Sequence, residues 1–308
     1  MVVIGALLII PNFIDAGRYK PEIAKYVLEA TGRTLDLEGD VRLSLFPWAG
    51  LTFSDLRMGN PPAFTEKDFL AVKSFDVRVK LWPLLSKQVE VDRLVVIEPR
   101  LFLVTNKDGK VNWKFGGRPA KTAPPAGSGP PPETAPPIAS LLVGEISVQN
   151  ALIAIIDHRR ESRREVSGLN ASLRDVSLDR PVRLTLSAAV DQKPLSAEGR
   201  FGPIGRNLGQ EGVPLELTAD AFGHLRLKAR GTVANLLVAP QARIEVEAAE
   251  FSPRRLFAEL GRPLPSTADP RVLERMSFKA GVTADTGAAS ISDALLILDD
   301  SKLRLTAS

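Results

Sequence analysis

The sequence predicts a mainly β protein whose strands form a long antiparallel sheet, accompanied by a few short helices. Residues 69–113 show this best, because Phe75, Val77 and Val79 alternate with charged neighbours, as in a strand with one dry and one wet face. Similar short alternating runs, separated by turn residues, return along the rest of the chain. The Asp-Gly pair in Lys107–Lys110 supplies the positive φ that a hairpin turn needs.

The chain opens with an apolar segment that has no charged side chain, Met1–Ile10, followed by Pro11. The segment is about half of a membrane-spanning helix, which needs roughly 20 apolar residues. A basic leading region and a small-residue cleavage site are both missing, which argues against a complete signal peptide. We therefore expect residues 1–14 to be the outer part of a membrane anchor whose true N-terminus is missing or wrongly assigned. A buried strand or the start of a buried helix is the alternative.

The clearest helix is expected at residues 20–30. Pro21 suits the first helical position, and Gly32 offers a left-handed stop. The apolar side chains that share one face are those of Tyr19, Ile23, Tyr26, Val27 and Ala30. Packed over the first strands, this helix would cap the open end of the sheet. We expect residues 15–115 to hold the helix and a β-meander, whose alternation shifts phase near Asp92-Arg93.

A stretch of proline, glycine and other small or polar residues occupies positions 116–137. Such a composition cannot bury a core, so the segment is expected to be disordered or extended. It either links separate domains or forms a long loop between neighbouring strands of one sheet. We favour the loop, because the strand pattern resumes at Ile138.

Residues 138–308 are expected to continue the sheet. Ser252 and Pro253 provide the N-cap and first residue of a short helix, which Gly261 ends. Because the chain stops at Ser308 directly after a strand, we expect it to be truncated at the C-terminus. The apolar positions that alternate in this region include Leu184, Leu186, Leu195, Leu215, Leu217, Leu225, Leu227, Ile244 and Val246.

Three tryptophans and one cluster of charges stand at expected turns. Trp48, Trp82 and Trp113 each adjoin turn residues, where packing at a strand end is the more common role and ligand contact the alternative. The cluster at residues 157–165 mixes basic and acidic side chains. We interpret this cluster as a solvated hairpin tip, with a patch that binds lipid headgroups as the alternative.

The composition argues against several classes of function. The chain has 308 residues and a net charge of +4, which does not favour nucleic-acid binding. It has no cysteine, so disulfide scaffolds, thiolate catalysis and cysteine-bound metals are excluded. His158 and His224 are too far apart in sequence to suggest a metal site or a catalytic pair. Since no hydrolase, nucleotide-binding or zinc-protease motif occurs, we expect no enzyme, no cofactor and no metal.

Three phrases follow one another between residues 81 and 113: LWPLL, then VEVDRLVVIEPRLFL, then DGKVNW. In this order they resemble the AsmA family of bacterial envelope proteins. The stretch 10–64 resembles the N-terminal block of that family, and residues 251–270 and 296–308 resemble its second conserved region. The resemblance is weak only between about Gly116 and Gly231.

The resemblance implies a curved sheet that forms an open, taco-like groove, anchored in the inner membrane by a single pass, with most of the chain in the periplasm. It also implies a role in outer-membrane biogenesis, of the kind performed by bridge-like lipid-transfer proteins. The partners so implied are phospholipid acyl chains and the inner membrane, with outer-membrane or periplasmic proteins as further candidates and no nucleic acid.

Two functional hypotheses follow. In the first, phospholipid travels along an uncovered apolar face, which shields acyl chains from water. Candidate lining positions are Phe75, Val77, Val79, Leu184, Leu186, Leu225, Leu227, Ile244 and Val246. The same side chains could instead fill a closed β core. In the second hypothesis, the protein is a structural or assembly factor that aids the targeting of outer-membrane proteins through contacts at a sheet edge.

Overall fold

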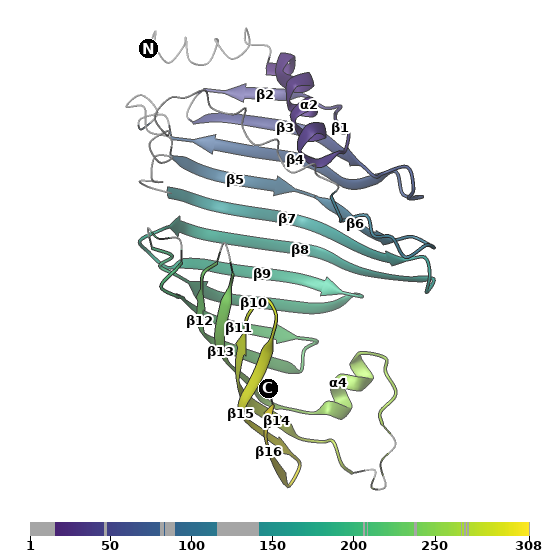
Figure 1. The fold of residues 1–308 in the computed structure, drawn as a ribbon, viewed down its shortest axis with the longest axis vertical. Coiled ribbons are helices and arrows are strands. Elements are labelled where there is room, and N and C mark those ends of the chain that lie inside the picture. The colour runs from purple at the N-terminus through teal and green to yellow at the C-terminus, as the bar shows by residue number, and fades with distance from the viewer. Residues whose placement is uncertain are drawn as a thin grey trace, which may run out of the picture. The chain divides into compact units, whose positions relative to one another are not determined.

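The computed structural model describes residues 16–45, 48–80, 83, 90–115, 142–205, 207, 209–236, 239–265, 267, 269 and 271–307. The strands form one mixed sheet of 16 strands (Figure 1). The expectation of a mainly β protein is therefore confirmed. By its contacts, the chain divides into two compact units, Met1–Asn170 and Ala171–Ser308. The anchor expected at residues 1–14 and the loop expected at 116–137 lie outside the described residues.

The first unit begins, within the described residues, with two helices and includes the parallel pairings of the sheet. Its elements are η2 (Ala16–Tyr19), α2 (Lys20–Thr31), β1 (Leu35–Leu37), β2 (Val41–Ser44), β3 (Ala49–Gly59), β4 (Asp68–Val79), β5 (Val91–Ile97), β6 (Arg100–Thr105) and β7 (Leu142–Asp157). The strand β8 (Ser162–Ser177) begins in this unit and ends in the second. The strand order is β1-β3-β4-β5-β7-β8, while β2 pairs with β3, and β6 pairs with β4 and β7.

Helix α2 confirms the helix expected from the sequence. It ends where Gly32 adopts a φ of 72° and donates its N–H to the carbonyl of Leu28. The helix contacts β1, and the Lys20 ammonium group donates to the carbonyl of Gly39 at 2.6 Å. No side chain of α2 is buried, however, and Tyr26 is 73% exposed. The apolar face expected to pack on the strands is therefore only loosely covered.

The pairing of β7 departs from the expected antiparallel meander. Both β5 and β6 pair with β7 in parallel, whereas β3 pairs with β1, β2 and β4, and β4 pairs with β5 and β6, in antiparallel fashion. A parallel neighbour needs a crossover of about a dozen residues or more. The connection from Thr105 to Leu142 is long enough for this, which explains why the sheet is mixed.

A line of irregular residues crosses the strands of the first unit. Asp55, Glu98 and Asn150 have φ values of 50°, 48° and 51°, which residues other than glycine rarely adopt. Glu98 connects the line, because its carboxylate pairs with Lys73 at 2.7 Å and its N–H donates to the carbonyl of Gln149 at 2.8 Å.

The alternation of apolar residues changes phase at this line. Val96 pairs with Val148 before the line, and Leu101 pairs with Ile153 after it. On both sides of the pairing, the second residue lies an odd number of positions after the first, whereas strict alternation would require an even number. Such a change is what a β-bulge produces. A separate register shift between β4 and β5 leaves Asp92 without a partner, which confirms the phase shift predicted near Asp92-Arg93.

A small core lies on β6 and β7. Val104 and Ala154 are fully buried and Ile156 is 8% exposed, with Phe64, Phe102 and Leu152 packed against them. Phe64 comes from the connection between β3 and β4, so this connection covers one end of the two strands.

The second unit is an antiparallel meander in which each strand pairs with the next, with register shifts among its last four strands. Its elements are β9 (Val182–Val190), β10 (Lys193–Phe201), β11 (Val213–Ala221), β12 (Leu225–Ala234), β13 (Gln241–Phe251), α4 (Pro253–Glu259), β14 (Met276–Ala284), β15 (Ala289–Leu298) and β16 (Ser301–Ala307). Helix α4 confirms the second predicted helix. The hydroxyl of its N-cap, Ser252, accepts a hydrogen bond from the Arg255 N–H at 3.3 Å, and Gly261 has a φ of 62°.

Candidate functional site

The register of the second unit gathers the predicted apolar positions into rows that run across the strands. Leu184 and Val246 belong to one row, and Leu186 and Leu227 belong to the next. The first row is Leu184, Gly199, Leu217, Ala229, Val246; the second is Leu186, Ala197, Ala219, Leu227, Ala248; a third is Phe201, Leu215, Gly231, Ile244, Val282. Each strand contributes to the three rows residues that are two positions apart. Such residues point to the same side of a sheet, so the three rows lie on one face.

Within the described part of the unit, no second sheet packs on this apolar face, although Val182 and Ala248 on it are buried and Glu259 of α4 pairs with Lys193 of β10 at 3.6 Å. The extensive contacts between its elements join only strands that are hydrogen-bonded neighbours. Accordingly, the six predicted lining residues of this unit are half-buried: Leu184, Leu186, Leu225, Leu227, Ile244 and Val246. In a β-sandwich, the facing sheet would bury such side chains. The described strands of this unit thus form a single layer with aliphatic side chains on one face.

The opposite face of the second unit is charged. Glu216 pairs with Arg200 at 2.7 Å and with Arg230 at 3.1 Å, and Asp220 pairs with Arg226 at 2.7 Å. The hydrogen bond from Arg200, together with its charge, lowers the pKa of the Glu216 carboxyl below its ordinary value. These cross-strand pairs keep one face of the sheet hydrophilic while the other remains apolar.

A hollow of ≈ 630 Å³ opens on this charged face rather than on the apolar one. Four basic and four acidic side chains line it, among them Arg200, Glu216 and Lys228. With four charges of each sign, the hollow has no excess charge that would select an ionic ligand. We therefore assign the candidate site to the apolar face.

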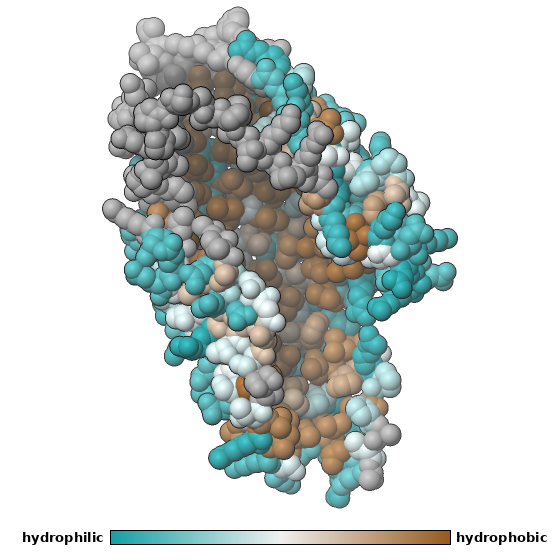
Figure 2. Space-filling model, in the orientation of Figure 1, coloured by the Kyte–Doolittle hydropathy of each residue, from teal (hydrophilic) through white to brown (hydrophobic). Residues whose placement is uncertain are grey.

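The first unit has rows of its own. One consists of Leu43, Leu51, Val77, Leu94 and Ile146, and another of Val41, Phe53, Phe75, Val96 and Val148. The predicted residues Phe75, Val77 and Val79 are half-buried, and the Phe53 and Phe75 rings lie 6.4 Å apart. Figure 2 shows hydrophobic residues gathered across the strands of this unit, bordered by hydrophilic ones.

Sequence reasoning missed several members of these rows. The predicted lining positions do not include five residues that alternate in the same way as Phe75 and Val77, namely Leu51, Phe53, Leu94, Val96 and Val148. The alternation of β3 could have identified the first two. Val148 could not have been matched to Val96, because the parallel pairing joins segments that are distant in sequence.

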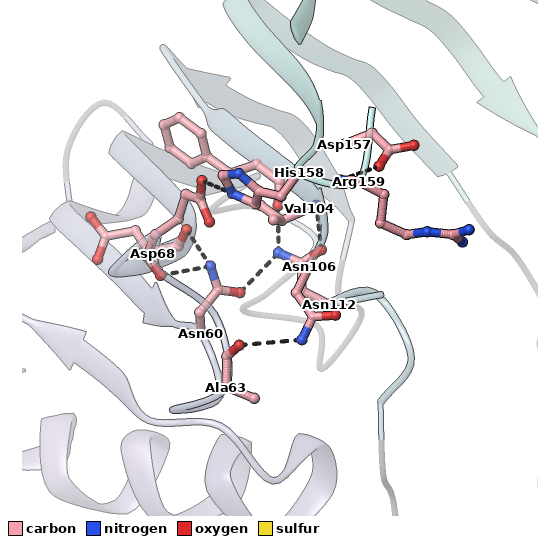
Figure 3. Close-up of polar contacts among 11 residues, drawn as sticks. Asn60, Ala63, Asp68, Val104, Asn106, Asn112, Asp157, His158 and Arg159 are labelled. Atoms are coloured by element: carbon pink, nitrogen blue, oxygen red, sulfur yellow. Dashed lines mark hydrogen bonds and ion pairs between the residues drawn. The ribbon is translucent and has the colours of Figure 1, made fainter. Parts of the chain in front are cut away.

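The DGKVNW phrase proves to be part of a polar cluster inside the first unit (Figure 3). The fully buried Asn112 accepts from the Val104 N–H at 2.8 Å and donates to Asn60 at 2.9 Å and to the carbonyl of Phe102 at 2.7 Å. Asn60 in turn donates to the carbonyls of Glu66 and Asp68. The phrase therefore ties the end of β6 to the connection between β3 and β4.

A buried guanidinium completes this cluster. Arg33 is 4% exposed, donates to the carbonyl of Asn112, and lies 4.3 Å from the ring centre of Phe69 and 4.6 Å from that of Phe115. Burial lowers the pKa of Arg33 from its ordinary value. With so little exposure, the guanidinium has no access to an outside ligand, and its contacts are structural.

Two tryptophans contradict the expectation that each would pack at a strand end. Trp48 is 43% exposed and Trp113 is 41% exposed, because both stand in turns that leave much of the indole in solvent. Trp82 lies outside the described residues.

The sequence profile of the AsmA family matches residues 1–289. The chain belongs to the AsmA family. Membership of this family supports an association of the protein with the bacterial cell envelope. A search of curated proteins found no match. Among the helices that the structure describes, none has the length and apolarity to cross a membrane.

Proposed function

We propose that this AsmA-family protein carries phospholipid, with acyl chains lying against the apolar faces of its two units. The observation behind the proposal is the set of half-buried aliphatic rows on which, among the described residues, no second sheet packs. Covering apolar surface is favourable by about 25 cal/mol per Å², or about 0.8 kcal/mol per buried CH₂ group. An acyl chain can therefore bind along such rows without any specific polar contact.

The proposal includes the setting of this activity. Family membership and the apolar segment Met1–Ile10 support a protein that is anchored in the inner membrane, extends into the periplasm and serves outer-membrane biogenesis. No catalytic step, cofactor or metal is part of the proposed function. Binding depends on a continuous apolar lining, so no single residue carries it.

Photo-crosslinking tests the proposal, because neighbouring residues of one strand face opposite sides of the sheet. A photo-reactive residue at Leu227 stands in an apolar row, whereas one at Lys228 stands on the charged face. We expect crosslinks to phospholipid acyl chains from Leu227 and none from Lys228, with the lipid identified by mass spectrometry. In the first unit, Val77 and Arg78 provide the same comparison.

The outcome separates the two functional hypotheses. Acyl-chain crosslinks that appear at Leu227 and Val77 but not at their strand neighbours support lipid carriage. Equal labelling at both members of each pair, or crosslinks to protein alone, would contradict it. Crosslinks to protein alone would favour an assembly factor.

A further inference from the structure

Two turns of the first unit lie side by side at one end of the sheet (Figure 1). The first follows β6 and contains Lys107 and Lys110; the second joins β7 to β8 and contains Arg159. They are tied together by the hydrogen bond from the His158 N–H to the carbonyl of Thr105, 2.9 Å long. The guanidinium of Arg159 also lies beside Gly109, with Nη1 3.2 Å from where a Cβ atom of that residue would be.

The two turns have an excess of positive charge. Segments 107–115 and 157–165 together contain seven basic and four acidic side chains. One of the acids, Asp157, is engaged locally, because its carboxylate accepts from the N–H groups of Arg159 and Arg160.

Three of the cations are available to a partner. Lys107, Lys110 and Arg159 are exposed, and within the described residues none of their side chains forms an ion pair. Figure 3 shows the Arg159 side chain extending away from the polar cluster. The acids Asp108 and Glu161 are exposed in the same turns and reduce the charge excess without removing it.

Large apolar side chains are exposed on the same segments. Trp113 is 41% exposed, Phe115 is 47% exposed, and Ile155, close to the β7–β8 turn, is 45% exposed. Trp113 and Phe115 lie three and five residues after Lys110. Aromatic side chains beside basic ones suit the boundary between lipid headgroups and acyl chains, where the rings reach the apolar layer and the cations meet phosphates.

We propose that this basic-aromatic tip, formed by Lys107, Lys110, Trp113 and Arg159, docks on a bilayer surface that carries anionic phospholipids. The excess of cations selects a negatively charged partner, and the exposed indole selects one with an apolar layer beneath the charge. A bilayer offers both. This docking does not depend on acyl chains occupying the sheet faces, so it can fail or succeed independently of the proposed function.

Vesicle binding by the full chain tests the proposal. The test variant combines Lys107→Gln, Lys110→Gln and Arg159→Gln. The matched control combines Lys228→Gln, Lys302→Gln and Arg304→Gln, which removes the same charge from exposed side chains of the second unit that form no ion pair within the described residues. Because both variants retain residues 1–10, any insertion of that apolar segment is common to both.

The vesicles contain either phosphatidylglycerol mixed equally with phosphatidylcholine or phosphatidylcholine alone. On anionic vesicles, each surface cation contributes about fivefold to binding, so the test variant should partition roughly a hundredfold more weakly than the unaltered chain. The control should change by less than about threefold, and added salt should weaken the unaltered chain most. Unchanged thermal unfolding of both variants shows that the fold is retained.

Trp113 provides a second, independent readout. In a chain with Trp48→Phe and Trp82→Phe, Trp113 is the remaining tryptophan, and brominated acyl chains in anionic vesicles should quench its fluorescence. Equal loss of vesicle binding in the test and control variants would overturn the proposal, as would a Trp113 that brominated lipid does not quench. Neither result would alter the crosslinks expected from Leu227, which test the proposed function.

Discussion

The two units use the same kind of strand in different ways. In the second unit, each strand pairs with the next, apolar and charged residues alternate, and the extensive contacts of the described residues join neighbouring strands of one layer. In the first unit, a line of residues with positive φ interrupts the alternation, one strand pairs in parallel, and a core and a polar cluster form. A meander thus forms with most of the side chains on its apolar face only half-buried, whereas the first unit also holds a core and a buried polar cluster.

This difference concentrates the buried polar groups in the first unit. Arg33, Asn106 and Asn112 are all buried there, and Asn112 is the most deeply buried of them. A buried polar group is costly when it loses its partners. The first unit should therefore be sensitive to single polar substitutions that would be tolerated on the exposed, ion-paired face of the second.

The largest effect is expected from Asn112→Ala. The substitution removes three hydrogen bonds and leaves the buried N–H of Val104 without its acceptor, which should cost about 3 kcal/mol. Hydrogen exchange is the appropriate measurement, because it reports β6 separately from the second unit. The exposed Asn207→Ala serves as the control and should cost less than about 0.5 kcal/mol. A similar small cost for Asn112→Ala would show that the polar cluster does not hold β6.

A glycine in the second unit should produce the next largest effect. A Cβ atom at Gly231 would lie 2.0 Å from the carbonyl oxygen of Arg243 on the neighbouring strand. Gly231→Ala should therefore push β12 and β13 apart and cost about 2 kcal/mol or more, measured as faster hydrogen exchange of both strands. At Gly287 the nearest atom would be 3.8 Å away, so Gly287→Ala is the matched control and should be nearly neutral. Equal exchange in the two variants would contradict the close approach of the strands.

The sequence predicts the second unit better than the first, for a physical reason. Strict alternation identified Leu184, Leu227 and Val246, because neighbouring strands of a meander are also consecutive in sequence. Local chemistry likewise predicted the helix that begins after Ser252 and the phase shift at Asp92.

The remaining features depend on contacts between distant segments. The parallel pairing of Val96 with Val148 follows a long crossover, which no local sequence pattern predicts. Asn112 stands after a turn in sequence, and only the fold brings it to Asn60 and buries it. The exposure of Trp113 also could not be predicted from the alternation of apolar and polar residues, since Trp113 lies outside a strand.

The third prediction compares a covered side chain with an uncovered one. Val104 is fully buried in the core of the first unit, whereas Leu227 is half-buried on the open face of the second. Val104→Ala should cost roughly 2 kcal/mol, because it leaves a cavity among packed neighbours. Leu227→Ala removes more atoms, yet should cost only about 1 kcal/mol in lipid-free protein, because solvent can fill the space. Hydrogen exchange of β6 and β12 measures both.

The order of these two costs decides whether the apolar face is open. If Leu227→Ala cost more than Val104→Ala in lipid-free protein, an opposing layer would have to cover the second unit. Binding of phospholipid should raise the cost of Leu227→Ala and leave that of Val104→Ala unchanged, because only the first of these side chains would contact the acyl chain.

The smallest effect is expected from Asp299, which holds the segment before β14 to the turn after β15. Its carboxylate accepts from the N–H groups of Arg275 at 3.0 Å, Leu273 at 2.7 Å and Glu274 at 3.0 Å. These hydrogen bonds, that of Arg275 foremost, lower the pKa of Asp299. Since the folded pKa lies below the unfolded one, the carboxylate stabilises the fold fully above about pH 4, the ordinary aspartate value, and this contribution is lost as the pH falls through the lowered pKa.

Asp299→Asn should therefore destabilise β14 and β15 at pH 7 and have a progressively smaller effect as the solution is acidified below pH 4. Hydrogen exchange of the two strands, compared between variant and unaltered chain at each pH, measures this difference. Asp300→Asn is the control: it removes only an ion pair with Arg275 at 3.4 Å between exposed side chains, and should change the exchange of both strands little. A destabilisation by Asp299→Asn that stayed constant with pH would mean that the ionised carboxylate is not what holds the three N–H groups.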